Sequence, residues 1–146
     1  METKQKIIWM LAVTLIVALA GCKTLQETAQ SKEVTQPDGV ALMTETELRK
    51  TLVGNTYEGE SVNYPGSTYI EFIQPDGTIR GLWNEKDHYK GEWVISGSVW
   101  CYKYKKSNGC STISKTGDTI FWYALDGTTR GGKAVVMAGD VKNLAQ

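Results

Sequence analysis

The sequence predicts an all-β domain, an antiparallel meander of about eight strands that forms a small barrel or barrel-like sandwich, preceded by one short helix. Residues 54–146 hold 13 of the 15 glycines in this 146-residue chain, about twice the usual frequency. Turn motifs rich in Gly, Pro, Asn and Asp recur there, separated by short runs of β-branched and aromatic residues. A meander of this length usually removes its edges by closing or rolling up.

Residues 1–21 have the pattern of a cleavable signal peptide. Lys4 and Lys6 form a basic start, and the apolar run Ile7–Ala20 follows, with Thr14 as its only polar residue. This run is shorter than the roughly 20 residues that a membrane-spanning helix needs. We therefore expect the segment to direct export and then to be removed.

The apolar run ends in Leu19-Ala20-Gly21-Cys22, which resembles the lipobox of bacterial lipoproteins. The resemblance implies that the thiol of Cys22 takes up a diacylglycerol and that its freed amine is acylated, for example with palmitate. Two or three acyl chains make such an anchor stable. Residue 23 is Lys rather than the Asp that would imply inner-membrane retention, so a Gram-negative host would place the protein in the outer membrane, facing the periplasm or the surface. The alternative is an ordinary signal peptide, or an uncleaved anchor, that ends in a cysteine.

The chain after the signal peptide divides into a tether and one domain. Residues 22–43 comprise the lipidated cysteine and a flexible tether without a sustained apolar period. Residues 44–146 form the barrel-like domain with its N-terminal helix. The 125 residues that remain without residues 1–21 are enough for one domain with a core and too few for two. Without residues 1–21 the chain keeps 14 basic and 15 acidic side chains. This balance gives no reason to expect a nucleic acid as partner.

The short helix is predicted within residues 44–54. Thr44 and Glu47 have the spacing of a capping box, in which each side chain accepts a hydrogen bond from the backbone of the other residue. Leu48 and Leu52 fall on one helical face, and Gly54 can end the helix. We expect this helix to plug one end of the domain.

Eight strands are predicted after the helix. In the fifth strand, Trp100, Tyr102 and Tyr104 alternate with charged residues and Cys101, which indicates that the aromatic side chains face inward. The second strand leaves its inner face undecided, because both of its faces carry apolar residues. The strands are predicted at Thr56–Glu60, Ser67–Ile73, Thr78–Asn84, Lys90–Ile95, Val99–Lys105, Cys110–Ser114, Thr119–Leu125 and Lys133–Ala138.

Cys101 and Cys110 remain as an even pair once Cys22 is assigned, and an exported chain favours a disulfide between them. Because Cys101 falls on the outer face, we expect the bond to staple the rim of a hairpin. A two-residue turn at Asn108-Gly109 would put the cysteines out of register. Either the loop is wider, spanning Lys105–Gly109, which we favour, or the two residues are not direct cross-strand neighbours.

The tryptophans and tyrosines are the residues with the most functional potential. They either fill the core or line a pocket inside the barrel. Gly91-Glu92-Trp93 resembles the Gly-x-Trp triplet of lipocalins, although here it lies on the fourth strand, and the domain as a whole is similar to small calycin-type barrels, including those of the avidin type. The resemblance implies the architecture and no particular ligand. The candidate ligand-lining residues are Trp83, Trp93, Trp100, Tyr102 and Trp122.

Catalytic and metal-binding motifs are not evident. His88, the single histidine, follows Asp87 in a predicted turn, and the sequence has no Cys-x-x-Cys pair and no Gly-x-Ser-x-Gly motif. We therefore predict no catalytic residue, no metal site and no cofactor. An acid/base pair at the barrel mouth would have to come from the strand carboxylates Glu58, Glu60, Glu71 and Glu92. The other polar feature is a local basic patch interleaved with tyrosines, which has the composition of a site for an anionic polymer such as lipopolysaccharide or single-stranded nucleic acid. The simpler explanation is a strand edge protected by lysines. The patch comprises Lys90, Lys103, Lys105, Lys106 and Lys115.

The sequence therefore predicts a membrane-tethered cell-envelope lipoprotein with a non-enzymatic binding or interaction domain. Its partners would be the membrane, through the covalent lipid, and an envelope protein or polymer. A carrier that holds a small ligand in an aromatic-lined barrel is the first alternative. A carboxylate-dependent hydrolase is a weaker one.

Overall fold

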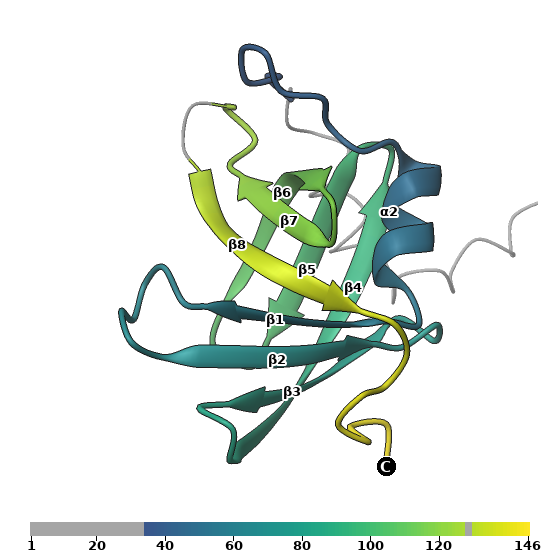
Figure 1. The fold of residues 1–146 in the computed structure, drawn as a ribbon, viewed down its shortest axis with the longest axis vertical. Helices are drawn as coiled ribbons and strands as arrows, with labels where there is room; N and C mark the ends of the chain where they lie inside the picture. Colours follow the sequence, from purple (N-terminus) through teal and green to yellow (C-terminus); the bar gives the residue numbers. More distant parts are fainter. Residues whose placement is uncertain (1–33, 128–129) are drawn as a thin grey trace, which may run out of the picture.

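A computed structural model describes residues 34–127 and 130–146 and confirms the predicted fold class. Eight antiparallel strands follow one another around a closed barrel, and β8 pairs back onto β1 (Figure 1). The elements are α2 (Glu45–Leu52), β1 (Thr56–Glu60), β2 (Thr68–Ile73), β3 (Thr78–Trp83), β4 (Asp87–Ser96), β5 (Val99–Tyr104), β6 (Asn108–Thr116), β7 (Thr119–Tyr123) and β8 (Arg130–Met137). The predicted signal peptide and Cys22 lie outside the described residues.

Helix α2 begins with the predicted capping box. The backbone N–H of Thr44 donates to the Glu47 carboxylate at 2.8 Å, and the Thr44 hydroxyl accepts from the backbone N–H of Glu47 at 3.4 Å. The helix ends before Gly54, whose φ of +78° is in the left-handed region that glycine adopts without strain. Leu48 and Leu52 are fully buried against the inward-facing side chains of the barrel. The helix therefore plugs one end of the barrel, as predicted.

We call the end covered by α2 the closed end, and the opposite end the far end. The Gly54 N–H donates to the carbonyl of Ile73 at the end of β2, and the Arg49 guanidinium donates to the carbonyl of Ile95 near the end of β4. The interior near the closed end is apolar: its buried side chains include Ile73, Ile79, Ile95, Ile113 and Ile120. The remaining inward positions toward the far end are mostly aromatic residues and glycine.

Residues 34–43, which we call the strap, lie on the outer surface of the barrel. The Thr35 N–H donates to the carbonyl of Leu125 at 2.9 Å, and the Met43 N–H donates to the carbonyl of Ile113 at 2.8 Å. Val34 packs against a buried outer cluster that includes Cys101. The last part of the predicted tether therefore contacts the barrel, and residues 22–33 lie outside the described residues.

The C-terminal residues cover a second apolar patch on the outer surface. Leu144 is buried against Ile70 and Phe72 of β2. The Asp140 carboxylate holds this segment by accepting from the backbone N–H groups of Leu144 and Ala145, each at 2.8 Å. Both faces of β2 are therefore buried, which explains why its pattern left the inner face undecided.

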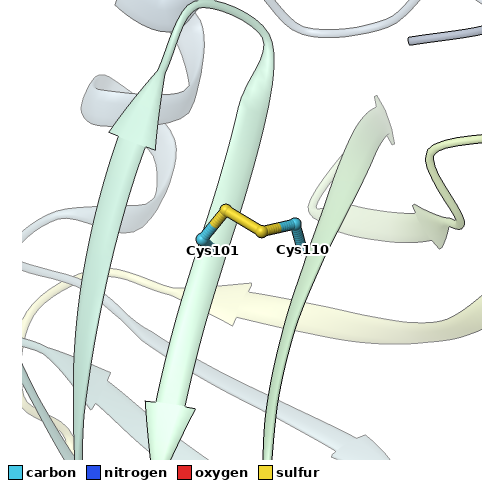
Figure 2. The surroundings of a disulfide bond; sticks show 2 residues. All are labelled: Cys101 and Cys110. Atoms are coloured by element: carbon cyan, nitrogen blue, oxygen red, sulfur yellow. A yellow bond between two sulfur atoms is a disulfide. The ribbon is translucent and has the colours of Figure 1, made fainter. Parts of the chain in front are cut away.

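Cys101 and Cys110 form the predicted disulfide across the hairpin of β5 and β6 (Figure 2). They are direct cross-strand partners because the loop between the strands comprises residues 105–107, so Asn108 and Gly109 belong to β6. The favoured pairing of the cysteines was right, but the loop is shorter than the predicted Lys105–Gly109. The expectation of a rim staple was wrong, because Cys101 is fully buried beneath Val34 and Leu125.

Candidate functional site

Four tyrosines inside the barrel each lie directly across from a glycine on the neighbouring strand. A Cβ atom added to any of these glycines would come within 2.8 Å or less of the paired tyrosine ring or hydroxyl. Each ring therefore lies directly over the backbone of its glycine partner. Any residue with a side chain at that position would overlap the ring. The register pairs are Gly59 with Tyr69, Gly81 with Tyr89, Gly91 with Tyr104, and Gly109 with Tyr102.

Glu71 of β2 lies at the centre of these rings and is only 4% exposed. The hydroxyls of Tyr89 and Tyr104 each donate to its Oε1 atom at 2.6 Å. The Tyr57 hydroxyl donates to Oε2. One buried carboxylate therefore accepts three hydrogen bonds from three different strands.

The electrostatics of this cluster follow from its burial. Loss of solvation raises the pKa of Glu71 above its ordinary value, while the hydrogen bonds from Tyr104, Tyr57 and Tyr89 act in the opposite direction. Within the described part of the chain, no Lys, Arg or His forms an ion pair with Glu71. The carboxylate is therefore stabilised by hydroxyl groups and not by a positive charge.

The tyrosines remain protonated donors at neutral pH. Burial, followed by the nearby Glu71 carboxylate, raises the pKa of Tyr69 to about 12, and the neighbouring Trp122 indole lowers it by a smaller amount. The same two causes raise the pKa values of Tyr89 and Tyr104 further. The indole Nε1 of Trp122 is itself buried and has no hydrogen-bond partner of normal geometry among the described residues.

The aromatic rings around Glu71 are not all fully buried. Several of them are partly exposed, in contrast to Trp100 near the closed end, which is 1% exposed. We call the whole arrangement the aromatic cup. Its members are Glu71 and the aromatic residues Tyr57, Tyr69, Tyr89, Tyr102, Tyr104 and Trp122.

Comparison of the chain with known protein families, with curated proteins and with solved structures finds no match. The resemblance to lipocalin-type and avidin-type barrels therefore stays a prediction from the sequence.

The five ligand-lining candidates all lie on the inward side of their strands, but only two belong to the cup, Tyr102 and Trp122. Trp93 stacks on Trp100 with ring centroids 5.5 Å apart, and its Nε1 donates to the carbonyl of Gln74 near the closed end. Trp83 packs edge-on against Tyr64 at the far end. The sequence pattern missed Glu71 as the centre of the site, because its surroundings depend on cross-strand register.

The other polar candidates do not join the cup. The carboxylates of Glu58, Glu60 and Glu92 alternate to the outer side of their strands, so none of them pairs with Glu71 inside the barrel. Asp87 and His88 are exposed at the start of β4 and not in a turn, which corrects the prediction.

The lysine patch does not form as expected either. Tyr102 and Tyr104 face inward, whereas Lys103 faces outward, and Lys115 is exposed near the closed end. Both explanations of these lysines need revision, because a closed barrel leaves no strand edge to protect and the tyrosines are not interleaved with them on one surface.

A surface hollow of about 510 Å³ lies outside the barrel, beside α2. Its lining includes Met43, Lys50, Thr51, Lys115 and Asp118, a mixture of both charges. In the described ranges, no three His, Cys, Asp or Glu side chains gather to hold a metal ion. No helix within those ranges has the length and apolar character to cross a bilayer.

Proposed function

We propose that this chain is a lipid-anchored cell-envelope protein whose barrel is a non-enzymatic binding domain, and that a small ligand binds in the aromatic cup. The observation that carries the binding proposal is the buried Glu71 with its three tyrosine hydroxyls. A barrel that only needed to be filled would be at least as stable with apolar side chains there, because a buried charge is costly to desolvate. Local departures from stable packing are typical of functional sites.

The cup also has the composition of a small-molecule site. Ligand sites in proteins are mostly apolar or aromatic, with a few polar groups that orient the ligand. Here Glu71 and the hydroxyls are the polar groups, and the rings of Tyr102 and Trp122 add partly exposed apolar surface.

The binding proposal is tested by a ligand screen on the full-length protein purified from membranes in detergent. Tryptophan fluorescence is suited to this screen because Trp122 belongs to the cup. A cup ligand is expected to change the fluorescence saturably and to raise the melting temperature. Gly109→Leu would fill the space over which the Tyr102 ring lies, and should abolish the response. Lys103→Leu, at an exposed position, is the matched control. A fluorescence response that persists in Gly109→Leu would contradict binding in the cup.

The lipid anchor is supported by the order of basic start, apolar run and lipobox in residues 1–22. Cys22→Ser is expected to abolish incorporation of radiolabelled palmitate and to leave an unprocessed precursor. Cys101→Ser, at the disulfide, serves as the control and should leave labelling intact. A Cys22→Ser protein that is still labelled and cleaved would overturn the lipoprotein assignment.

An envelope protein or polymer is the second candidate partner, and exposed apolar side chains favour it. Val62 is 57% exposed and Tyr64 is 65% exposed, both in the β1–β2 loop at the far end. A partner docked on this loop would be lost with Val62→Ser and Tyr64→Ser, which replace no member of the cup. A small ligand bound in the cup would be retained by both variants.

A further inference from the structure

The aromatic cup presents negative potential to any ligand that enters it. Glu71 supplies a carboxylate without a positive partner among the described residues, and each hydroxyl that donates to it keeps lone pairs that can accept from a ligand. Ring faces add the negative side of their quadrupoles.

Several positively charged side chains of the barrel strands lie outside the cup. The alternation of each strand puts Arg80, Lys90, Lys103 and Lys133 on the outer surface, and Lys115 is exposed near the closed end. The cup therefore combines a buried negative charge with walls that also favour a cation.

The ring walls stand at steep angles to one another. The planes of Tyr89 and Tyr104 meet at 84°, with centroids 5.6 Å apart, and those of Tyr57 and Tyr69 meet at 83°, with centroids 6.1 Å apart. Trp122 meets Tyr57 at 61°. These are edge-to-face contacts between neighbouring rings, which together form a continuous aromatic lining beside Glu71.

From these contacts we propose that the cup binds a small organic cation, an ammonium group bearing alkyl substituents. This inference rests on the proposed function, in which the cup is the ligand site. An alkylammonium supplies the positive charge that Glu71 lacks, and its alkyl groups contact the ring faces through cation–π attraction. A neutral ligand of the same shape gains only the apolar contact, and an anion is repelled by the carboxylate.

The test uses three probes of nearly equal shape and different charge: choline, 3,3-dimethylbutan-1-ol and 3,3-dimethylbutanoate. Each is titrated into the full-length protein in detergent at neutral pH and constant ionic strength, with tryptophan fluorescence as the readout. Choline is expected to bind at least tenfold more tightly than the alcohol, a difference of about 1.4 kcal/mol. The carboxylate probe is expected to show no saturable change.

Two variants assign the charge selectivity to Glu71. Glu71→Gln removes the charge with little change of shape, and should reduce choline affinity at least tenfold while leaving the alcohol unchanged. Glu92→Gln makes the same change on the outer surface and should leave choline affinity intact. Near-ultraviolet circular dichroism checks that both variants fold. If Glu71→Gln does not fold, the three-probe series on the native protein still decides whether the cup prefers a cation.

The outcomes separate this inference from the proposed function. If the alcohol or the carboxylate binds as tightly as choline, the cup is a ligand site and the cation inference is wrong. If none of the three binds while the broader screen yields another cup ligand, the cation inference is again wrong and the proposed function stands. If the screen also yields no cup ligand, both are overturned.

Discussion

At the scale of single residues, glycine decides where the polar centre of this barrel can form. Gly81 and Gly91 have no side chain, so the rings of Tyr89 and Tyr104 can lie over them and direct both hydroxyls to the same Glu71 oxygen. The hydrogen bonds to the Glu71 carboxylate therefore require glycine at these two positions. Each residue type depends on the others being present.

Gly81→Ala is expected to destabilise the fold by about 1–3 kcal/mol, because the new methyl group would overlap the Tyr89 ring and force it off Glu71. Urea unfolding followed by tryptophan fluorescence measures the change. Gly131→Ala is the control, since its Cβ would lie 3.5 Å from the nearest atom, an ordinary contact. Equal stability of Gly81→Ala and the native protein would show that the ring does not need the bare backbone.

Glu71 makes a specific contribution to the pH dependence of stability. Its pKa is raised in the folded state, so the native protein holds this proton more tightly than the unfolded chain does. The free energy of unfolding should therefore fall as the pH rises from about 4.5, the ordinary value, through the raised pKa. Below that window the contribution is complete.

Glu71→Gln should abolish this fall. Urea unfolding of both proteins between pH 4 and pH 9, taken as a difference, isolates the effect. Groups such as Glu47 and Asp76, whose pKa values are lowered by hydrogen bonds, contribute equally to both proteins and cancel. Parallel curves for the two proteins would mean that burial does not shift the titration of Glu71.

At the scale of the elements, α2 and the β5–β6 hairpin each fix one part of the barrel. The helix closes the apolar end with Leu48 and Leu52, while the hairpin is joined by the disulfide on the outer surface. The hairpin also takes part in the cup itself, because the Tyr104 hydroxyl of β5 donates to Glu71. Both elements support the cup by holding the strands that carry it.

Leu52→Ala should lower the free energy of unfolding by about 2–5 kcal/mol, because the side chain is fully buried and the closed end cannot collapse around the space it leaves. Thermal or urea denaturation gives the value. Thr46→Ala, at an exposed position of the same helix, should change stability little. A small effect of Leu52→Ala would mean that α2 is not part of the cooperative core.

The double variant Cys101→Ala, Cys110→Ala is expected to have a free energy of unfolding about 2–3 kcal/mol lower than that of the native protein, because the disulfide no longer restricts a short loop in the unfolded chain. Native protein unfolded in the presence of dithiothreitol should show the same loss. Its refolded form should still bind any cup ligand, because the disulfide lies on the outer surface. If ligand affinity fell together with the free energy of unfolding, ligand binding would depend on the disulfide, contrary to this prediction.

At the scale of the whole molecule, local patterns predicted the helix and the eight strands because capping residues, glycine-rich turns and alternation all lie within a few positions of one another. These local patterns did not predict the two terminal segments that cover apolar patches on the outer surface of the barrel. Val34 and Leu144 stand in segments without a period, yet they bury Cys101, Ile70 and Phe72.

The centre of the candidate site was hidden for a related reason. The sequence shows that Tyr69, Glu71 and Ile73 share one face of their strand, but not which glycine each tyrosine meets. That depends on register, which shifts with every loop length. The loop at residues 105–107 is one example, since it alone sets Tyr102 opposite Gly109.

The strap gives the molecule a direction of mechanical loading. Under the proposed anchor, tension from the bilayer enters the described fold at Val34. It acts first on the Thr35–Leu125 hydrogen bond and on the outer cluster reinforced by the disulfide. The pull would reach α2, which plugs the closed end, only after the strap had separated from the barrel as far as Met43. Under this anchor, the disulfide lies beside the first point at which the fold is loaded, and the aromatic cup lies away from that point.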